Sequence, residues 1–212
     1  GFFPWLADRL AESGFAAIRF DFSFNGIGED GETFDHLDRF ALNTVTRELA
    51  DLQRVLAALR AGEIPQAARL DTGRISLLGH SLGGGVSLLA ALEDGGLKSV
   101  VTWASVAHFF HGCDRELWKR QGHLDFLNAR TQQVMRLDYV VCQDLEANAA
   151  KYDLRTRLAA LAVPVLLVHG EADLSVPPAA SESLKRSLGE RGTLRLLPGV
   201  DHAFGAAHPF RG

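Results

Sequence analysis

Short apolar runs alternate with amphipathic segments along this chain. Because buried strands that alternate with helices form parallel sheets covered on both faces, the alternation predicts an α/β fold. Five runs rich in β-branched or aromatic residues predict buried strands, and they cover Ala16–Phe22, Arg74–Gly79, Ser99–Ala104, Val163–His169 and Thr193–Leu197. Apolar residues at helical spacing predict helices between the strands, at Pro4–Ser13, Leu42–Leu59, Leu82–Glu93 and Pro177–Leu188.

One long interval departs from this alternation. Residues 106–161 separate two expected strands by far more than a crossover helix needs, and they are rich in charged, histidine and aromatic residues. No repeat or flexible linker divides the chain. We therefore expect one domain over residues 1–212 with an inserted lid at 106–161, placed above the carboxyl ends of the strands, where open α/β sheets bind ligands.

Composition removes several classes of function. The net charge is -4 and the charges are interspersed, so no basic surface is expected to bind nucleic acid. The chain has no stretch of about 18 consecutive apolar residues, the length that a membrane-spanning helix needs. The two cysteines, Cys113 and Cys142, form no CxxC pair, and we expect free thiols and a cytoplasmic location.

The sequence Gly79-His80-Ser81-Leu82-Gly83 lies between an apolar strand and an apolar helix. The pentapeptide alone is weak, but a strand, a tight turn and a helix form the setting that lifts a serine hydroxyl above a sheet. We expect Gly79 and Gly83 to remove side chains that would collide in this turn. Leu82 N–H, at the helix N-terminus, is the expected oxyanion donor.

A serine nucleophile needs an imidazole base and a carboxylate to orient that base. Asp173 follows the most hydrophobic strand, and Glu171 is its rival two residues earlier. His202 follows the last expected strand and comes after both acids. His80 is expected to point away from Ser81. We predict the catalytic set Ser81, Asp173 and His202.

Two other patterns carry less chemistry. His108 and His111 lie near Cys113, but no further spaced ligand completes a metal site, and we expect neither metal nor cofactor. Asp21 precedes Ser81, so we interpret it as a residue that hydrogen-bonds loop backbone beside the site. Arg130, in the expected lid, could pair with an acidic substrate, although a structural or solvated role is the simpler interpretation.

With these residues in view, nearly the whole chain resembles the α/β-hydrolase superfamily. The likeness rests on Arg19-Phe20-Asp21-Phe22 with Asn25-Gly26, on the Ser81 pentapeptide, and on His169-Gly170-Glu171-Ala172-Asp173 with Asp201-His202. It is nearest to small bacterial esterases of the cinnamoyl and feruloyl type and to acyl-peptidase and dienelactone-hydrolase-like proteins. Dienelactone hydrolases proper use a cysteine nucleophile, where this chain has Ser81.

The resemblance implies features that this chain does not contain. In relatives, an earlier strand lies in the sheet between the strands expected here at Ala16–Phe22 and Arg74–Gly79. That strand ends in a His-Gly loop, which supplies the second oxyanion donor. We expect that strand before Gly1 and a terminal helix after His202, and therefore a fragment that lacks both ends.

The expected activity is hydrolysis of carboxylic esters through an acyl-enzyme, with a small-molecule ester as the partner. A peptidase or an acyltransferase could use the same three residues. A catalytically silent binding module is the alternative from another class.

Overall fold

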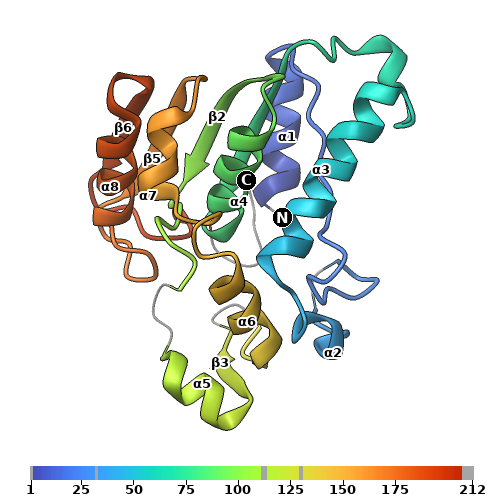
Figure 1. The fold of residues 1–212 in the computed structure, drawn as a ribbon. Coiled ribbons are helices and arrows are strands. Elements are labelled where there is room, and N and C mark those ends of the chain that lie inside the picture. Colours follow the sequence, from blue (N-terminus) through green and yellow to red (C-terminus); the bar gives the residue numbers. More distant parts are fainter. Residues whose placement is uncertain (1, 32, 111–113, 129–130, 207–212) are drawn as a thin grey trace.

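A parallel sheet forms the centre of the computed structural model, which describes residues 2–31, 33–110, 114–128 and 131–206. Its four strands lie in the order β1-β2-β5-β6 (Figure 1), and all three neighbouring pairs are parallel. The strands are β1 (Ile75–His80), β2 (Leu97–Trp103), β5 (Val165–Gly170) and β6 (Gly192–Leu197). Four of the five predicted strands and the predicted α/β architecture are thereby confirmed.

The fifth predicted strand, Ala16–Phe22, is wrong. This segment is in neither a helix nor a strand, and Phe15 and Ile18 beside and within it are 65% and 40% exposed. A strand persists only when a neighbour satisfies its backbone N–H and C=O groups, and within the described residues no strand pairs with this segment.

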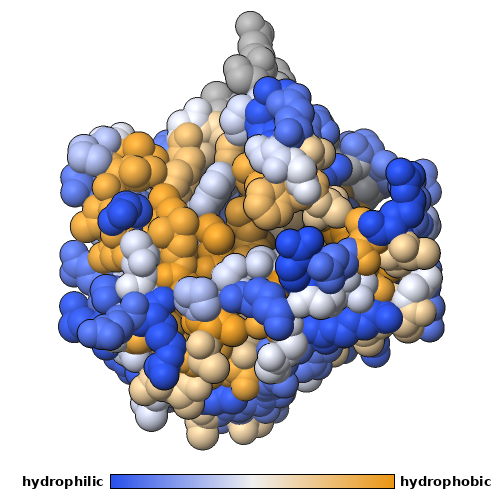
Figure 2. All heavy atoms as spheres, turned by 90° about the horizontal axis from the view of Figure 1, so that it is seen from above, coloured by the Kyte–Doolittle hydropathy of each residue, from blue (hydrophilic) through white to orange (hydrophobic). Residues whose placement is uncertain are grey.

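Apolar groups reach the surface on the face that Figure 2 displays. The exposed large apolar residues of the chain include Phe3, Trp5, Phe15, Ile18, Phe20 and Leu78.

Helices pack against the sheet and against one another. The longest, α3 (Val45–Ala61), begins after Thr44, whose hydroxyl accepts the N–H of Arg47, and ends at Gly62. It packs on α4 (Leu82–Glu93), which covers β1 and β2, while α8 (Ala179–Leu188) covers β5 and β6. Apolar side chains of these helices and strands form the main core. The other elements in this part are α1 (Phe2–Glu12), α2 (Leu37–Phe40) and the 3₁₀ turns Ala67–Arg69, Leu158–Ala160 and Gly189–Arg191.

The expected lid region contains a second, smaller structural unit. It consists of α5 (Arg115–Gln121), the antiparallel pair β3 (His123–Leu127) and β4 (Val134–Asp138), and α6 (Tyr139–Ala147). Figure 1 shows this unit below the parallel sheet. It has its own small core around Trp118, Val141 and Cys142. The following helix α7 (Leu154–Arg157) instead packs into the main core through Leu154.

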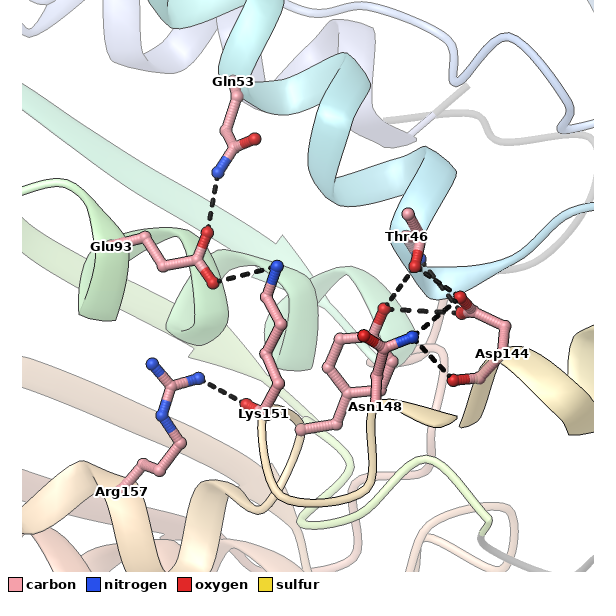
Figure 3. A network of polar contacts seen from close by, with 8 residues as sticks. Thr46, Gln53, Glu93, Asp144, Asn148, Lys151 and Arg157 are labelled. Atoms are coloured by element: carbon pink, nitrogen blue, oxygen red, sulfur yellow. Dashed lines mark hydrogen bonds and ion pairs between the residues drawn. The ribbon is translucent and has the colours of Figure 1, made fainter. Parts of the chain in front are cut away.

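A polar network joins α6 to the first turn of α3 (Figure 3). The Asp144 carboxylate accepts the Thr46 N–H at 3.2 Å and also the Thr46 hydroxyl. Tyr152 Oη lies 2.6 Å from the same hydroxyl, and Asn148 Nδ2 donates to Asp144 at 3.2 Å. First-turn amides of a helix have no partner within that helix, so a carboxylate from α6 satisfies one that α3 leaves open.

The network also affects the acidity of Tyr152. Burial, followed by the nearby Asp144 charge, raises the pKa of this phenol to about 12, although the Thr46 hydrogen bond acts in the opposite direction. Tyr152 is therefore a neutral hydroxyl at physiological pH.

In the described part of the chain, no helix has the length and hydropathy needed to cross a membrane.

Candidate active site

Ser81 occupies a sharp turn between β1 and α4. Its φ of 55° and ψ of -121° are rare and strained for a residue with a side chain. A Cβ added at Gly79 would lie 2.2 Å from the Gly83 carbonyl oxygen, so the turn requires glycine there. A Cβ at Gly83 would meet nothing within 4 Å. For a single added Cβ, the close approach in this turn is thus at Gly79 and not at Gly83.

The turn is fixed to the neighbouring strand. Ser81 N–H donates to the Trp103 carbonyl at the end of β2, at 2.8 Å. Leu82 is the first residue of α4, so its N–H is one of the first-turn amides that no helical carbonyl accepts. That amide stands next to Ser81 at the positive end of the helix dipole.

His202 and Asp173 form a direct pair. His202 Nδ1 lies 2.7 Å from Asp173 Oδ2. An ionised carboxylate only accepts hydrogen bonds, so Nδ1 carries the proton of the neutral ring and Nε2 is left as the basic nitrogen. The rival acid, Glu171, is exposed to solvent. Within the described residues, no hydrogen bond joins its side chain to His202.

Asp173 is buried yet well supplied with donors. Its other oxygen, Oδ1, accepts the backbone N–H groups of Ser175 and Val176, both at 2.9 Å. Burial acts to raise the pKa of Asp173, but the Val176 N–H, His202 and the Ser175 N–H together outweigh it, and the pKa lies below its ordinary value. The carboxylate is therefore held ionised next to the imidazole.

Backbone contacts bring the loops of Asp173 and His202 together. Ala172 N–H donates to the Val200 carbonyl at 2.9 Å. A Cβ at Gly170 would lie only 2.1 Å from that same carbonyl oxygen, so this approach requires glycine at the end of β5. Gly170 was part of the motif singled out in the sequence, but its role in closing the two loops could not be deduced without the fold.

His80 connects the serine turn to the His202 loop. Its Nε2 lies 2.8 Å from the His202 carbonyl oxygen, and the centroids of the two imidazole rings are 4.7 Å apart. Burial lowers the pKa of His80 below its ordinary value, so the ring is neutral and Nε2–H is the donor. Among the described residues no hydrogen bond joins Ser81 Oγ to the His202 ring; the serine turn is linked to the His202 loop through His80.

Other candidates from the sequence lie apart from this arrangement. Asp21 accepts a hydrogen bond from Asn25 Nδ2 at 3.0 Å, and it is Asn25 Oδ1 that accepts a loop N–H, from Ile27 at 2.9 Å. The expected bond from Asp21 to loop backbone is thus replaced by one through Asn25. His111, Cys113 and Arg130 lie outside the described residues. Cys142 is buried and forms no disulfide bond within the described residues.

Similar folds occur in several solved structures. The putative hydrolase from Agrobacterium vitis S4 has a TM-score of 0.67 and 24% identity, with 92% of this chain and 72% of that chain covered. A structure from work on the metagenome-derived lipolytic enzymes LipS and LipT has a TM-score of 0.67 and 18% identity, covering 95% and 80%. Est1E from Butyrivibrio proteoclasticus has a TM-score of 0.55 and 21% identity, covering 77% and 64%.

These identities are low, so the likeness concerns the fold. The chain spans 62% of the length of the esterase domain of a Rhodothermus marinus protein, with a TM-score of 0.53 and 20% identity over 78% of this chain. A search of curated proteins finds no match. The model of the Alpha/beta hydrolase family, in contrast, matches residues 1–211. With a parallel sheet, a strained serine turn and an Asp–His pair in the loops beyond it, the chain belongs to the alpha/beta hydrolase family.

Proposed function

We propose that this protein is a serine hydrolase that cleaves carboxylic esters through an acyl-enzyme intermediate. The observation that supports it most directly is the hydrogen bond of 2.7 Å between His202 and Asp173, in a loop tied by His80 to the strained turn of Ser81. A serine in such a turn, with a base and an orienting acid in this chain order, is the arrangement that acyl transfer requires.

Each group has one role in the proposed reaction. His202 Nε2 takes the proton of the Ser81 hydroxyl as Oγ attacks the ester carbonyl carbon. Asp173 keeps the proton on Nδ1 and stabilises the imidazolium that forms. Leu82 N–H donates to the oxyanion. His202 then protonates the leaving alcohol, and afterwards deprotonates the water that attacks the acyl-enzyme. These steps need no metal and no cofactor.

A serine substitution tests the proposal. Ser81→Ala should lower kcat/KM on p-nitrophenyl acetate by a factor on the order of 10⁴ or more, because the attacking atom is removed. The same variant should lose labelling by a fluorophosphonate probe, which reacts only with an activated serine. Ser76→Ala, near the start of β1 and away from the serine turn, is the matched control; the Ser76 hydroxyl lies 2.8 Å from the Ser99 hydroxyl.

Two results would contradict the assignment. Wild-type turnover in Ser81→Ala would remove the nucleophile from the proposal. Absence of both labelling and turnover in the folded wild-type protein would favour a catalytically silent binding module. Amide and ester substrates compared in parallel would separate a peptidase from an esterase, since both use the same three residues.

A further inference from the structure

A second, fully buried imidazole contacts the carboxylate of Asp173. His169 lies in β5 with its side chain shielded from solvent. Its Nε2 is 3.2 Å from Asp173 Oδ2 and 2.8 Å from the Val176 carbonyl oxygen. Its Nδ1 is 2.7 Å from the hydroxyl of Ser181, a buried residue in the first turn of α8. The mechanism proposed above uses none of these contacts.

One tautomer of the neutral ring satisfies all three contacts. A backbone carbonyl can only accept a hydrogen bond, so Nε2 carries the proton and donates it to the Val176 oxygen. The positive end of the same N–H also lies near Asp173 Oδ2, which is 3.2 Å from Nε2. Nδ1 is then the acceptor for the Ser181 hydroxyl. The Val176 carbonyl therefore fixes the tautomer, and the Ser181 hydroxyl supports it by donating to Nδ1.

Both imidazoles contact the same oxygen. Asp173 Oδ2 lies 2.7 Å from His202 Nδ1 and 3.2 Å from His169 Nε2, while Oδ1 is occupied by two backbone amides. We propose that His169, in the tautomer set by the Val176 carbonyl and supported by Ser181, is a positioning residue whose N–H takes up part of the negative charge of Asp173 that His202 would otherwise experience. The catalytic part of this inference depends on the proposed function; the contact between the side chains does not.

The direction of the effect follows from the shared oxygen. The His169 N–H near Asp173 Oδ2 stabilises part of the negative charge on that oxygen, so it weakens the attraction between the carboxylate and the His202 imidazolium. Without that donor, the imidazolium gains stability and His202 becomes more basic. His80 is the other ring that faces His202, from the serine turn; being neutral, it changes little in this comparison.

The titration of the His202 ring tests this proposal directly. In ¹⁵N-histidine NMR titrations, His169→Phe should raise the pKa of His202 by about half a unit to one unit. His169→Gln, whose side-chain N–H can still donate, should restore at least half of that shift. Ser181→Ala should raise it by a smaller amount, because the Nε2–H tautomer loses the hydroxyl donor that supports it at Nδ1. In the wild type, the His169 resonances should show a protonated Nε2 and an unprotonated Nδ1.

Activity supplies a second readout. In His169→Phe the acidic limb of the pH profile of kcat/KM should move to higher pH with the His202 titration, and kcat should fall about tenfold with KM changed less than about twofold. The matched control is Thr102→Val in the adjacent strand β2, where a buried hydroxyl has no hydrogen-bond partner within the described structure. It should leave both the titration and the profile unchanged.

The outcomes are distinguishable. A His202 titration that is unchanged in folded His169→Phe, or equally changed in Thr102→Val, would overturn the role of His169. If His169→Phe does not fold, the titrations of His169→Gln and Ser181→Ala decide, and an unchanged value in Ser181→Ala overturns the proposal. If Ser81→Ala retains turnover, the proposed function fails, whereas the NMR titration still decides whether His169 acts on His202.

Discussion

Two buried carboxylates of this protein, Asp173 and Glu48, have opposite acidities. Their residues are 4% and 5% exposed. The pKa of Asp173 lies below its ordinary value despite burial. The pKa of Glu48 is raised from 4.5 to about 7, chiefly by burial. Removal from water is common to both, so it cannot explain the difference.

The number of hydrogen-bond donors explains it. Asp173 accepts from two backbone amides and from His202. Glu48 Oε1 accepts from Asn43 Nδ2 at 2.6 Å, whereas Oε2 has no partner within the described residues, and Asp51 nearby raises the pKa further. A buried carboxylate stays ionised when donors replace its lost hydration. The fold supplies them at the candidate site and withholds them at the start of α3.

Removing the charge of Asp173 should have the greatest consequence for activity. Asp173→Asn should lower kcat/KM on p-nitrophenyl esters by about 10³–10⁴-fold, because an amide neither stabilises the imidazolium nor fixes the required tautomer. Glu171→Gln, two residues earlier and exposed, is the control and should stay near the wild type. Equal losses in the two variants would contradict the role of Asp173.

The next largest effect concerns stability at Glu48. Between pH 4.5 and about 7 the folded state keeps a proton that the unfolded state has released. Stability should therefore fall as the pH rises through this window, by about 3 kcal/mol, and level off above it. Glu48→Gln should abolish this loss in urea unfolding at pH 5 and pH 8, whereas exposed Glu63→Gln should keep it. A loss that persists in Glu48→Gln would show that another group causes it.

The smallest effect isolates the neighbouring charge. Asp51→Asn should lower the pKa of Glu48 by less than about one unit, since a single nearby charge is being removed. Asp51 also accepts the hydroxyl of Ser23 at 2.7 Å, so Ser23→Ala removes that bond without changing the charge. NMR titration of Glu48 in the two variants would separate the effects. An equal shift in Ser23→Ala would assign the change to the loop instead.

The sequence was most informative where local chemistry and tertiary structure agree. The Ser81 turn, the strand before it, the helix after it and the pair of Asp173 with His202 could all be predicted, because each depends on short motifs at the ends of apolar runs. Ala16–Phe22 had the same apolar pattern but failed as a strand, since pairing depends on a neighbour that no local pattern reveals.

Contacts between distant segments were equally hidden. His80 was expected only as part of the serine turn, and its bond to the His202 carbonyl depends on how two loops meet. The shared oxygen of Asp173 could not be foreseen either, because it requires β5 and the first turn of α8 to place His169 and Ser181 within hydrogen-bonding distance. No signal in a single sequence marks such a contact.

The carboxylate of Asp144 has a consequence for how the molecule comes apart. This carboxylate accepts the Thr46 amide in the first turn of α3. If α6 moves away, that amide loses its hydrogen-bond partner and the start of α3 is destabilised. The smaller unit around Trp118 and the longest helix of the main body thus share one cooperative opening. Hydrogen exchange at the Thr46 amide would record each departure of α6, even though that amide belongs to α3 and not to the smaller unit.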